Sequence, residues 1–151
     1  MGKSFIKTVK PKRDSHYHQG VVDPKACKKY MGSCKNEPII YRSGIELAFI
    51  QYCENNSKVV KWASEPIQIP YTSRLDGRQH KYYPDFIFEN TDGHRVIVEV
   101  KPESQTVKPD ATDTLWLKEQ WIKNVDKWTA AKQFADKHDM KFILVTEKFF
   151  K

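Results

Sequence analysis

Two carboxylates and one amine stand on a pair of short apolar segments in the middle of the chain. Asp85 follows Pro84, and after 13 further residues the sequence reads Glu99-Val100-Lys101. Successive side chains of a strand point to opposite faces, so Glu99 and Lys101 would share one face and Val100 would occupy the other. Charged side chains on a half-buried strand are costly unless they have partners or a function. These residues are therefore candidates for a chemical site.

The turn between the two segments predicts how they are aligned. Residues 90–93 read Asn-Thr-Asp-Gly, which favours a hairpin between strands at 80–89 and 94–101. A turn centred near residue 92 puts Asp85 opposite Glu99, although a slip of one residue would separate them. Two carboxylates a few ångströms apart suit Mg²⁺ or Mn²⁺, which polarises a phosphate and lowers the pKa of a bound water. Lys101 could orient that water or stabilise the charge that develops on the phosphate.

The surrounding elements are predicted from caps and periodicity. Ser43 and Glu46 form an S-x-x-E capping box that starts a helix ending at residues 55–56, from which Glu46 could reach the same cluster. Asp113 is expected to cap a second, long helix. Its apolar face would carry Leu117, Trp121, Val125, Trp128 and Ala135. Strands are predicted at 59–63, 67–71, 80–89, 94–101 and 142–145. The order predicts an α/β layered domain.

The positive charge of the chain is concentrated near its N-terminus. The formal net charge is +7, and residues 1–42 hold ten Lys and Arg against three acidic residues, so the remainder is balanced. We expect a basic arm over 1–41, with one short helix at 24–31, followed by one domain over 42–151. Such an arm suits DNA because each cation on a phosphate releases a counterion, whereas a solvated tail explains the charge equally well. The candidate DNA-binding residues of the arm are Lys10, Lys12, Arg13, Lys28 and Lys29.

Several classes of protein are excluded or disfavoured. No apolar stretch approaches the roughly 20 residues of a membrane-spanning helix, and the N-terminus lacks the apolar region of a secretion signal. We therefore expect no membrane partner, and also no small-molecule cofactor. Three cysteines favour free thiols in a reducing compartment. His16, His18, Cys27 and Cys34 could supply four zinc ligands, but their spacing is not that of a regular zinc site, so ordinary core or surface residues are expected.

The chemistry-bearing residues resemble a known nuclease motif. Pro84-Asp85 and Glu99-Val100-Lys101 are similar to the PD-(D/E)xK motif of a large superfamily of nucleases. Residues 42–46, Arg-Ser-Gly-Ile-Glu, resemble a helix start in phage junction-resolving endonucleases and in the N-terminal domain of the endonuclease subunit of heteromeric transposases. The layout of the whole chain is similar to that of the head completion nucleases of T-even-type tailed bacteriophages. The resemblance implies a restriction-endonuclease-like αβββαβ core, with a mixed central sheet flanked by helices.

The resemblance also implies roles for individual residues. Glu46, Asp85, Glu99 and the backbone carbonyl of Val100 would bind one or two Mg²⁺ or Mn²⁺ ions, and Lys101 would be the catalytic base.

Further contributions are implied less directly. Some relatives use a Gln or Lys of the second helix, which makes Gln120 and Lys123 candidates. Arg42 and Ser43 could bind a phosphate at the helix N-terminus, although a cap is the simpler account of Ser43.

The function that follows is metal-dependent hydrolysis of DNA. By resemblance, the enzyme would act in phage head completion on packaged DNA before the tail joins, with portal or neck proteins as candidate partners. It would work in the host cytoplasm during assembly or stay with the virion. The alternatives are a non-catalytic DNA-binding or virion structural protein on a nuclease scaffold, and a DNA junction or transposon-end endonuclease.

Overall fold

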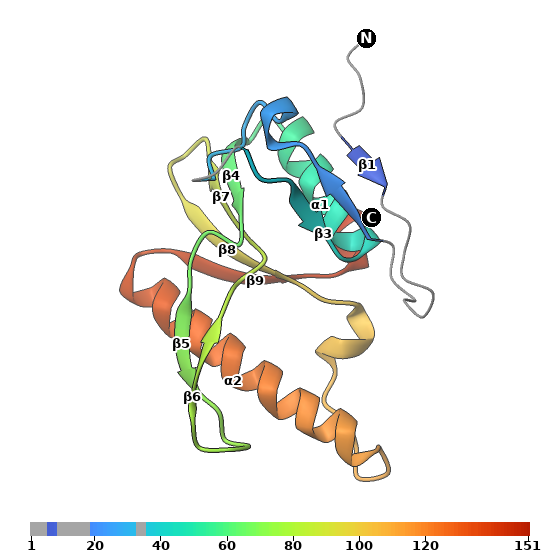
Figure 1. Cartoon of the computed structure of the whole chain (residues 1–151). Coiled ribbons are helices and arrows are strands. Elements are labelled where there is room, and N and C mark those ends of the chain that lie inside the picture. The colour runs from blue at the N-terminus through green and yellow to red at the C-terminus, as the bar shows by residue number, and fades with distance from the viewer. Residues whose placement is uncertain (1–5, 9–18, 33–35) are drawn as a thin grey trace.

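A four-stranded mixed sheet lies at the centre of the computed structural model, which describes residues 6–8, 19–32 and 36–151 (Figure 1). Its order is β4-β7-β8-β9, with β9 parallel to β8 and the other pairs antiparallel. The strands are β4 (Val59–Ser64), β7 (Phe86–Asn90), β8 (Arg95–Val100) and β9 (Lys141–Val145). Helix α1 (Gly44–Asn55) and helix α2 (Leu115–Lys137) flank it. The predicted fold class is confirmed.

Alternating side chains divide the sheet between the two helices. Val98 and Val145 pack with Phe49 and Ile50 of α1 in the main core, whereas Phe142 packs in a second cluster that includes Ala131 of α2. Glu99 and Lys101 therefore belong to the face that looks toward α2. This is the alternation that the sequence predicted.

The hairpin of β7 and β8 has the predicted alignment. Phe86 pairs with Val98 and Ile87 with Ile97, so Asp85, directly before β7, comes opposite Glu99. Gly93 closes the turn with φ 83°, a positive value that glycine adopts without strain. The turn chemistry therefore fixes the register on which the candidate site depends.

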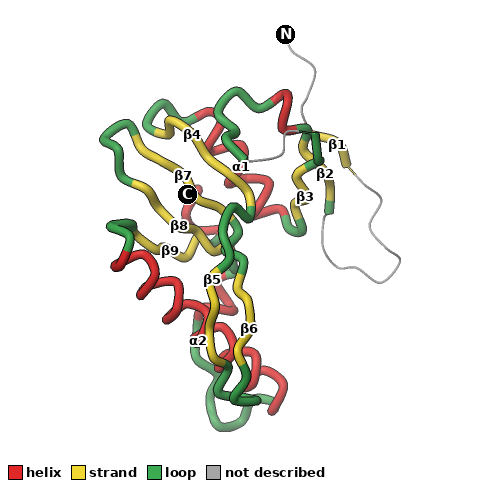
Figure 2. The backbone as a smooth tube through the Cα atoms, turned by 60° about the vertical axis from the view of Figure 1, so that its left-hand side comes forward, coloured by secondary structure: helices red, strands yellow, loops and turns green. Residues whose placement is uncertain are grey.

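The prediction of one continuous strand over 80–89 is wrong. β6 (Gln79–Tyr82) pairs with β5 (Ile69–Thr72) in a separate two-stranded sheet, and the chain crosses to the main sheet through residues 83–85 (Figure 2). Pro84 explains the break, because it has no N–H to donate to a ladder. The β5–β6 hairpin instead packs against α2, to which Arg74 is tied by a 2.6 Å ion pair with Asp126.

Helix α1 begins and ends where the sequence predicted, whereas α2 begins one residue later than predicted. Ser43 Oγ accepts from Glu46 N at 3.1 Å and caps α1. The cap of α2 is Thr114 rather than Asp113, because the Asp113 carboxylate accepts from Asp110 N instead. Of the predicted apolar face, Trp121, Val125 and Trp128 are half-buried and Ala135 is buried.

The prediction that Leu117 faces the core is wrong. Its exposed fraction is 41%, because the first turns of α2 extend past the main sheet (Figure 1).

The described part of the N-terminal segment is packed into the core. A small antiparallel sheet has the order β1 (Ile6–Thr8), β2 (Gly20–Val22), β3 (Ile39–Tyr41). The predicted helix at 24–31 is a single 3₁₀ turn, η1 (Pro24–Ala26), since Tyr30 forms a bridge with Trp62 of β4. Buried side chains from this segment join the core under α1: Val22, Cys27, Tyr30, Ile39 and Tyr41. The boundary at residues 41 and 42 stays a prediction, but the described residues before it are not an extended arm.

Two further 3₁₀ turns, η2 (Glu103–Thr106) and η3 (Glu147–Phe150), complete the described elements. Among the helices of the described residues, none has the length and apolar character needed to cross a bilayer.

Candidate active site

Asp85 and Glu99 meet where the β7–β8 ladder ends. By the register of the hairpin, Val100 stands opposite Pro84, which is outside the ladder. The Val100 N–H instead donates to Asp85 Oδ2 at 2.7 Å. This bond fixes one oxygen of the carboxylate against the backbone of β8. The acid of the first segment is thus held beside the Glu-Val-Lys of the second.

Glu99 is enclosed by groups that hold its carboxylate. Only 7% of the residue is exposed. The Tyr82 hydroxyl donates to Oε2, while Lys101 Nζ lies 3.7 Å from Oε1. Tyr82 ends β6, so the small hairpin contributes directly to the site. Glu99 and Lys101 share a face as predicted, and they form an ion pair.

Glu46 approaches the pair from α1. As the third residue of that helix, it reaches back to accept a hydrogen bond from Arg42 N at 2.9 Å. Burial, and then the charge of Asp85, raises the pKa of Glu46 to about 7. The charge of Asp85 therefore acts on Glu46, and the role of Glu46 as a metal ligand stays a prediction.

The cluster carries more negative charge than its surroundings stabilise. Burial raises the pKa of Asp85, and the Val100 N–H and Lys101 oppose that rise. Burial and the charge of Asp85 raise the pKa of Glu99, and Tyr82 and Lys101 oppose it. Buried like charges disfavour the ionised state. A small cation between the carboxylates would favour it.

The donor set fits a hard divalent cation held by two carboxylates. Within residues 6–8, 19–32 and 36–151, no three His, Cys, Asp or Glu side chains gather as a complete metal site. Mg²⁺, however, is usually bound through one or two carboxylates, with water and substrate phosphate completing the shell. Asp85 and Glu99 are such a pair. The carbonyl of Val100, between Glu99 and Lys101 in the chain, remains a predicted ligand.

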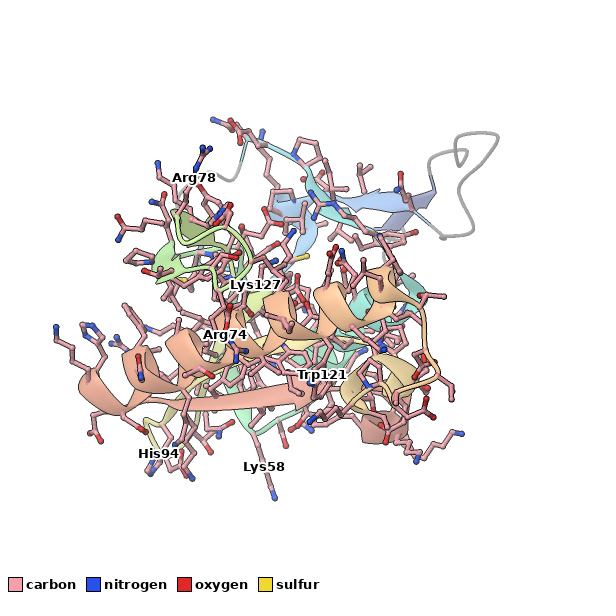
Figure 3. The ribbon with its side chains drawn as sticks, turned by 90° about the horizontal axis from the view of Figure 1, so that it is seen from below. Lys58, Arg74, Arg78, His94, Trp121 and Lys127 are labelled. Atoms are coloured by element: carbon pink, nitrogen blue, oxygen red, sulfur yellow. The ribbon has the colours of Figure 1, made fainter. Side chains whose placement is uncertain are left out.

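Lys127 is a charged neighbour of the site that the sequence did not reveal. Its ammonium lies 5.7 Å from the centre of the Tyr82 ring, and it is half-buried on α2 (Figure 3). Burial, followed by the charge of Lys123, lowers the pKa of Lys127, while Glu99 opposes that change. Lys127 lies about two turns after Gln120, so the same helix face carries both.

The predicted helix contributors are placed differently. Gln120 lines a cavity that also contains Lys101. Lys123 is exposed, and its charge acts on Lys127. The sequence could have pointed to Lys127, because this lysine lies two turns after Gln120. That inference requires knowledge of which face of the helix meets the sheet.

Comparison with known proteins now assigns the family. The sequence model of a protein family, the TnsA-like endonuclease N-terminal domain, matches residues 56–147. This span includes Asp85, Glu99 and Lys101. The chain belongs to the TnsA-like endonuclease family. It is also 34% identical over 133 residues to the head completion nuclease of Enterobacteria phage T4, covering 82% of this chain and 87% of that protein. The resemblance to nucleases seen in the sequence is confirmed. Glu46 precedes the matched span, so its inclusion in the site stays a prediction.

Several predicted DNA-binding residues of this TnsA-like chain have structural partners. Arg42 forms a 3.0 Å ion pair with Glu65, and Ser43 is the cap of α1. Lys29 Nζ donates to the carbonyls of Cys53 and Asn56 at the end of α1.

Of the remaining predicted DNA-binding residues, only Lys28 lies within the described structure. Lys28 is exposed, and its backbone N–H donates to Glu54. Lys10, Lys12 and Arg13 lie outside the described residues.

The four residues considered as zinc ligands in the sequence lie only partly within the described structure. His16, His18 and Cys34 lie outside the described residues. Cys27 is buried, its thiol donates to the carbonyl of Asp23 at 3.5 Å, and burial raises its pKa to about 12. Cys27 is thus part of the described core, and whether the four residues bind zinc stays untested.

Proposed function

We propose that this chain is a DNA endonuclease that depends on a divalent metal. The observation that carries the proposal is the meeting of Asp85, Glu99 and Lys101 at the end of one hairpin, in a chain of the TnsA-like endonuclease family. Mg²⁺ or Mn²⁺, one or two ions, would be held by Asp85 and Glu99, with Glu46 and the Val100 carbonyl as further ligands.

When bound, the metal would neutralise charge on the scissile phosphodiester and favour ionisation of the attacking water. The side chains divide the remaining work. The Val100 N–H orients Asp85, and the Tyr82 hydroxyl orients Glu99. Lys101 as an ammonium orients the attacking water, or in its neutral form accepts the proton of that water as the phosphorus–oxygen bond to the leaving sugar breaks. Lys127 adds positive charge on the side of Glu99.

We extend the proposal to the biological setting through the T4 relative. A head completion nuclease would act on packaged phage DNA before the tail joins, with portal or neck proteins as partners. It would act in the host cytoplasm during assembly, or remain associated with the virion.

The decisive test is a digest of linear, circular, single-stranded and branched DNA by the full chain. We expect cutting with Mg²⁺ or Mn²⁺, none in excess EDTA, and a loss of at least about 100-fold in Asp85→Asn. Asp139→Asn is the matched control, because Asp139 is exposed and its φ of 56° suits asparagine. Mg²⁺ should raise the Tm of the wild type and leave that of Asp85→Asn unchanged.

Full cutting by Asp85→Asn, or by the wild type in EDTA, would refute the proposed mechanism. Binding of DNA without cutting under any metal condition would instead support the non-catalytic alternative.

A further inference from the structure

A cavity of about 140 Å³ opens beside Lys101, between the segment that contains η2 and the first half of α2. Its walls include Lys101, Gln105, Val107, Trp116, Gln120 and Trp121. Lys101 is shared with the candidate active site, where it pairs with Glu99. The cavity therefore adjoins the candidate active site, with Lys101 common to both.

The rim of the cavity is unusually apolar for a surface. Val107 is 63% exposed and Trp116 is 65% exposed, and both line the cavity. Isolated exposed apolar residues are common, but a tryptophan grouped with other apolar side chains at a cleft marks a binding site. Trp116 thus brings an exposed aromatic ring to the cavity.

The lining also contains side chains that can form hydrogen bonds with the edge of a nucleobase. Gln105, Gln120 and Asn124 each carry an amide that offers both a donor and an acceptor. Lys101 supplies a positive charge at the same wall. Together these groups suit one nucleotide. The aromatic ring would stack on the base, the amides would bind the edge of the base, and the cation would bind the phosphate.

We propose that this cavity binds an unpaired nucleobase of the DNA strand being cut, stacked on Trp116. The assignment rests on the proposed endonuclease function and refines its substrate to DNA with an unpaired base near the cut. A cavity of about 140 Å³ is on the scale of one flat ring rather than of a base pair. The unpaired base can come from a single-stranded region or from a locally opened duplex.

The test measures DNA affinity by fluorescence anisotropy in EDTA, where nothing is cut. The probes are a single-stranded oligonucleotide, the same strand with abasic sites, a duplex with one mispaired position, and a fully paired duplex. The variants of the full chain are Trp116→Ala and Trp116→Phe. Leu115→Ala is the matched control, because Leu115 is the adjacent residue, is 72% exposed and does not line the cavity.

We expect Trp116→Ala to weaken binding of the single strand by about 5- to 150-fold, the range for one lost base stack. Trp116→Phe should restore most of this affinity, and Leu115→Ala should bind as the wild type does. The abasic strand should bind wild type and Trp116→Ala equally. If the mispaired duplex shows the Trp116 effect, the base comes from local opening; an effect confined to the single strand assigns it to single-stranded regions.

Equal binding of the single strand by wild type and Trp116→Ala would overturn the proposal. So would a loss that is equally large on abasic DNA, because the cavity would then contact the backbone. Both results are independent of cutting. A Trp116 effect in a protein that never cuts DNA would refute the endonuclease proposal alone, whereas metal-dependent cutting without a Trp116 effect would refute the base site alone.

Discussion

Replacing Glu46 by glutamine should stabilise the metal-free protein at alkaline pH. Glu46 is a half-buried carboxylate on which the charge of Asp85 acts, and its pKa rises from an ordinary 4.5 to about 7. Glutamine has nearly the same shape and can still accept the hydrogen bond from Arg42 N. The change therefore removes a charge and leaves the start of α1 intact.

The magnitude follows from proton linkage. Between pH 4.5 and 7 the folded state binds more protons than the unfolded state, so the free energy of unfolding of the wild type falls as pH rises through this range. At about 1.4 kcal/mol per pKa unit, the full cost above pH 7 is about 3 kcal/mol. The helix N-terminus favours a negative charge and Glu46 is not fully buried, which reduces the expected gain to about 2 kcal/mol. For a chain of this size, that gain corresponds to a rise of about 4–8 °C in Tm.

The assay is thermal unfolding in EDTA at pH 8 and at pH 5. Glu46→Gln should be more stable than the wild type at pH 8, with the difference reduced to about a quarter at pH 5. Glu54→Gln is the opposite control on the same helix. Glu54 accepts from Lys28 N, Lys29 N and Trp62 Nε1 at 2.8, 3.1 and 2.8 Å, so neutralising it should lower stability by about 2 kcal/mol at both pH values.

An unchanged Tm at pH 8 would show that the folded state does not penalise the Glu46 charge. A gain of equal size at both pH values would show that glutamine improves packing or capping rather than relieving repulsion. Either result would contradict the description of the Glu46 charge as one that burial and the nearby charge of Asp85 disfavour.

Two further substitutions test the surroundings of the site. Tyr82→Phe removes the hydroxyl that lowers the pKa of Glu99, so the acidic limb of the pH–rate profile should move to higher pH. The control Tyr83→Phe loses only a hydrogen bond to an exposed glutamine and should leave the profile unchanged. Lys127→Met removes a positive charge that acts on Glu99 and should lower kcat by about 10- to 100-fold, while Lys132→Met, at an exposed ion pair of the same helix, should match the wild type in the same cleavage assay. A shifted profile in Tyr83→Phe, or equal rates for the two lysine variants, would contradict the assigned contacts.

The core of the site could be predicted because the interactions that build it are local. The Ser43 cap fixes the start of α1 within one turn, and the glycine turn fixes the alignment of β7 with β8. Asp85 and Glu99 then meet by register alone. Each of these signals lies within a few residues of the element that it determines.

The remaining features depend on contacts between distant segments. The prediction of one strand over 80–89 overlooked Pro84, and the pairing of β6 with β5 rather than with the main sheet depends on tertiary contacts. Lys127 joins the site only because that face of α2 turns toward Tyr82. Val22 and Ile39 lie in strands of three residues, too short for a periodicity to identify.

The packing of the N-terminal sheet has a practical consequence for shortening the chain. Removing residues 1–38 would strip Val22, Cys27 and Tyr30 from beneath α1, and with them the support of the helix that carries Glu46. A deletion intended to ask what Lys10, Lys12 and Arg13 contribute must therefore stop ahead of Gly20, where β2 begins. Beyond that point, any lost affinity for DNA would reflect a damaged fold as much as missing positive charge.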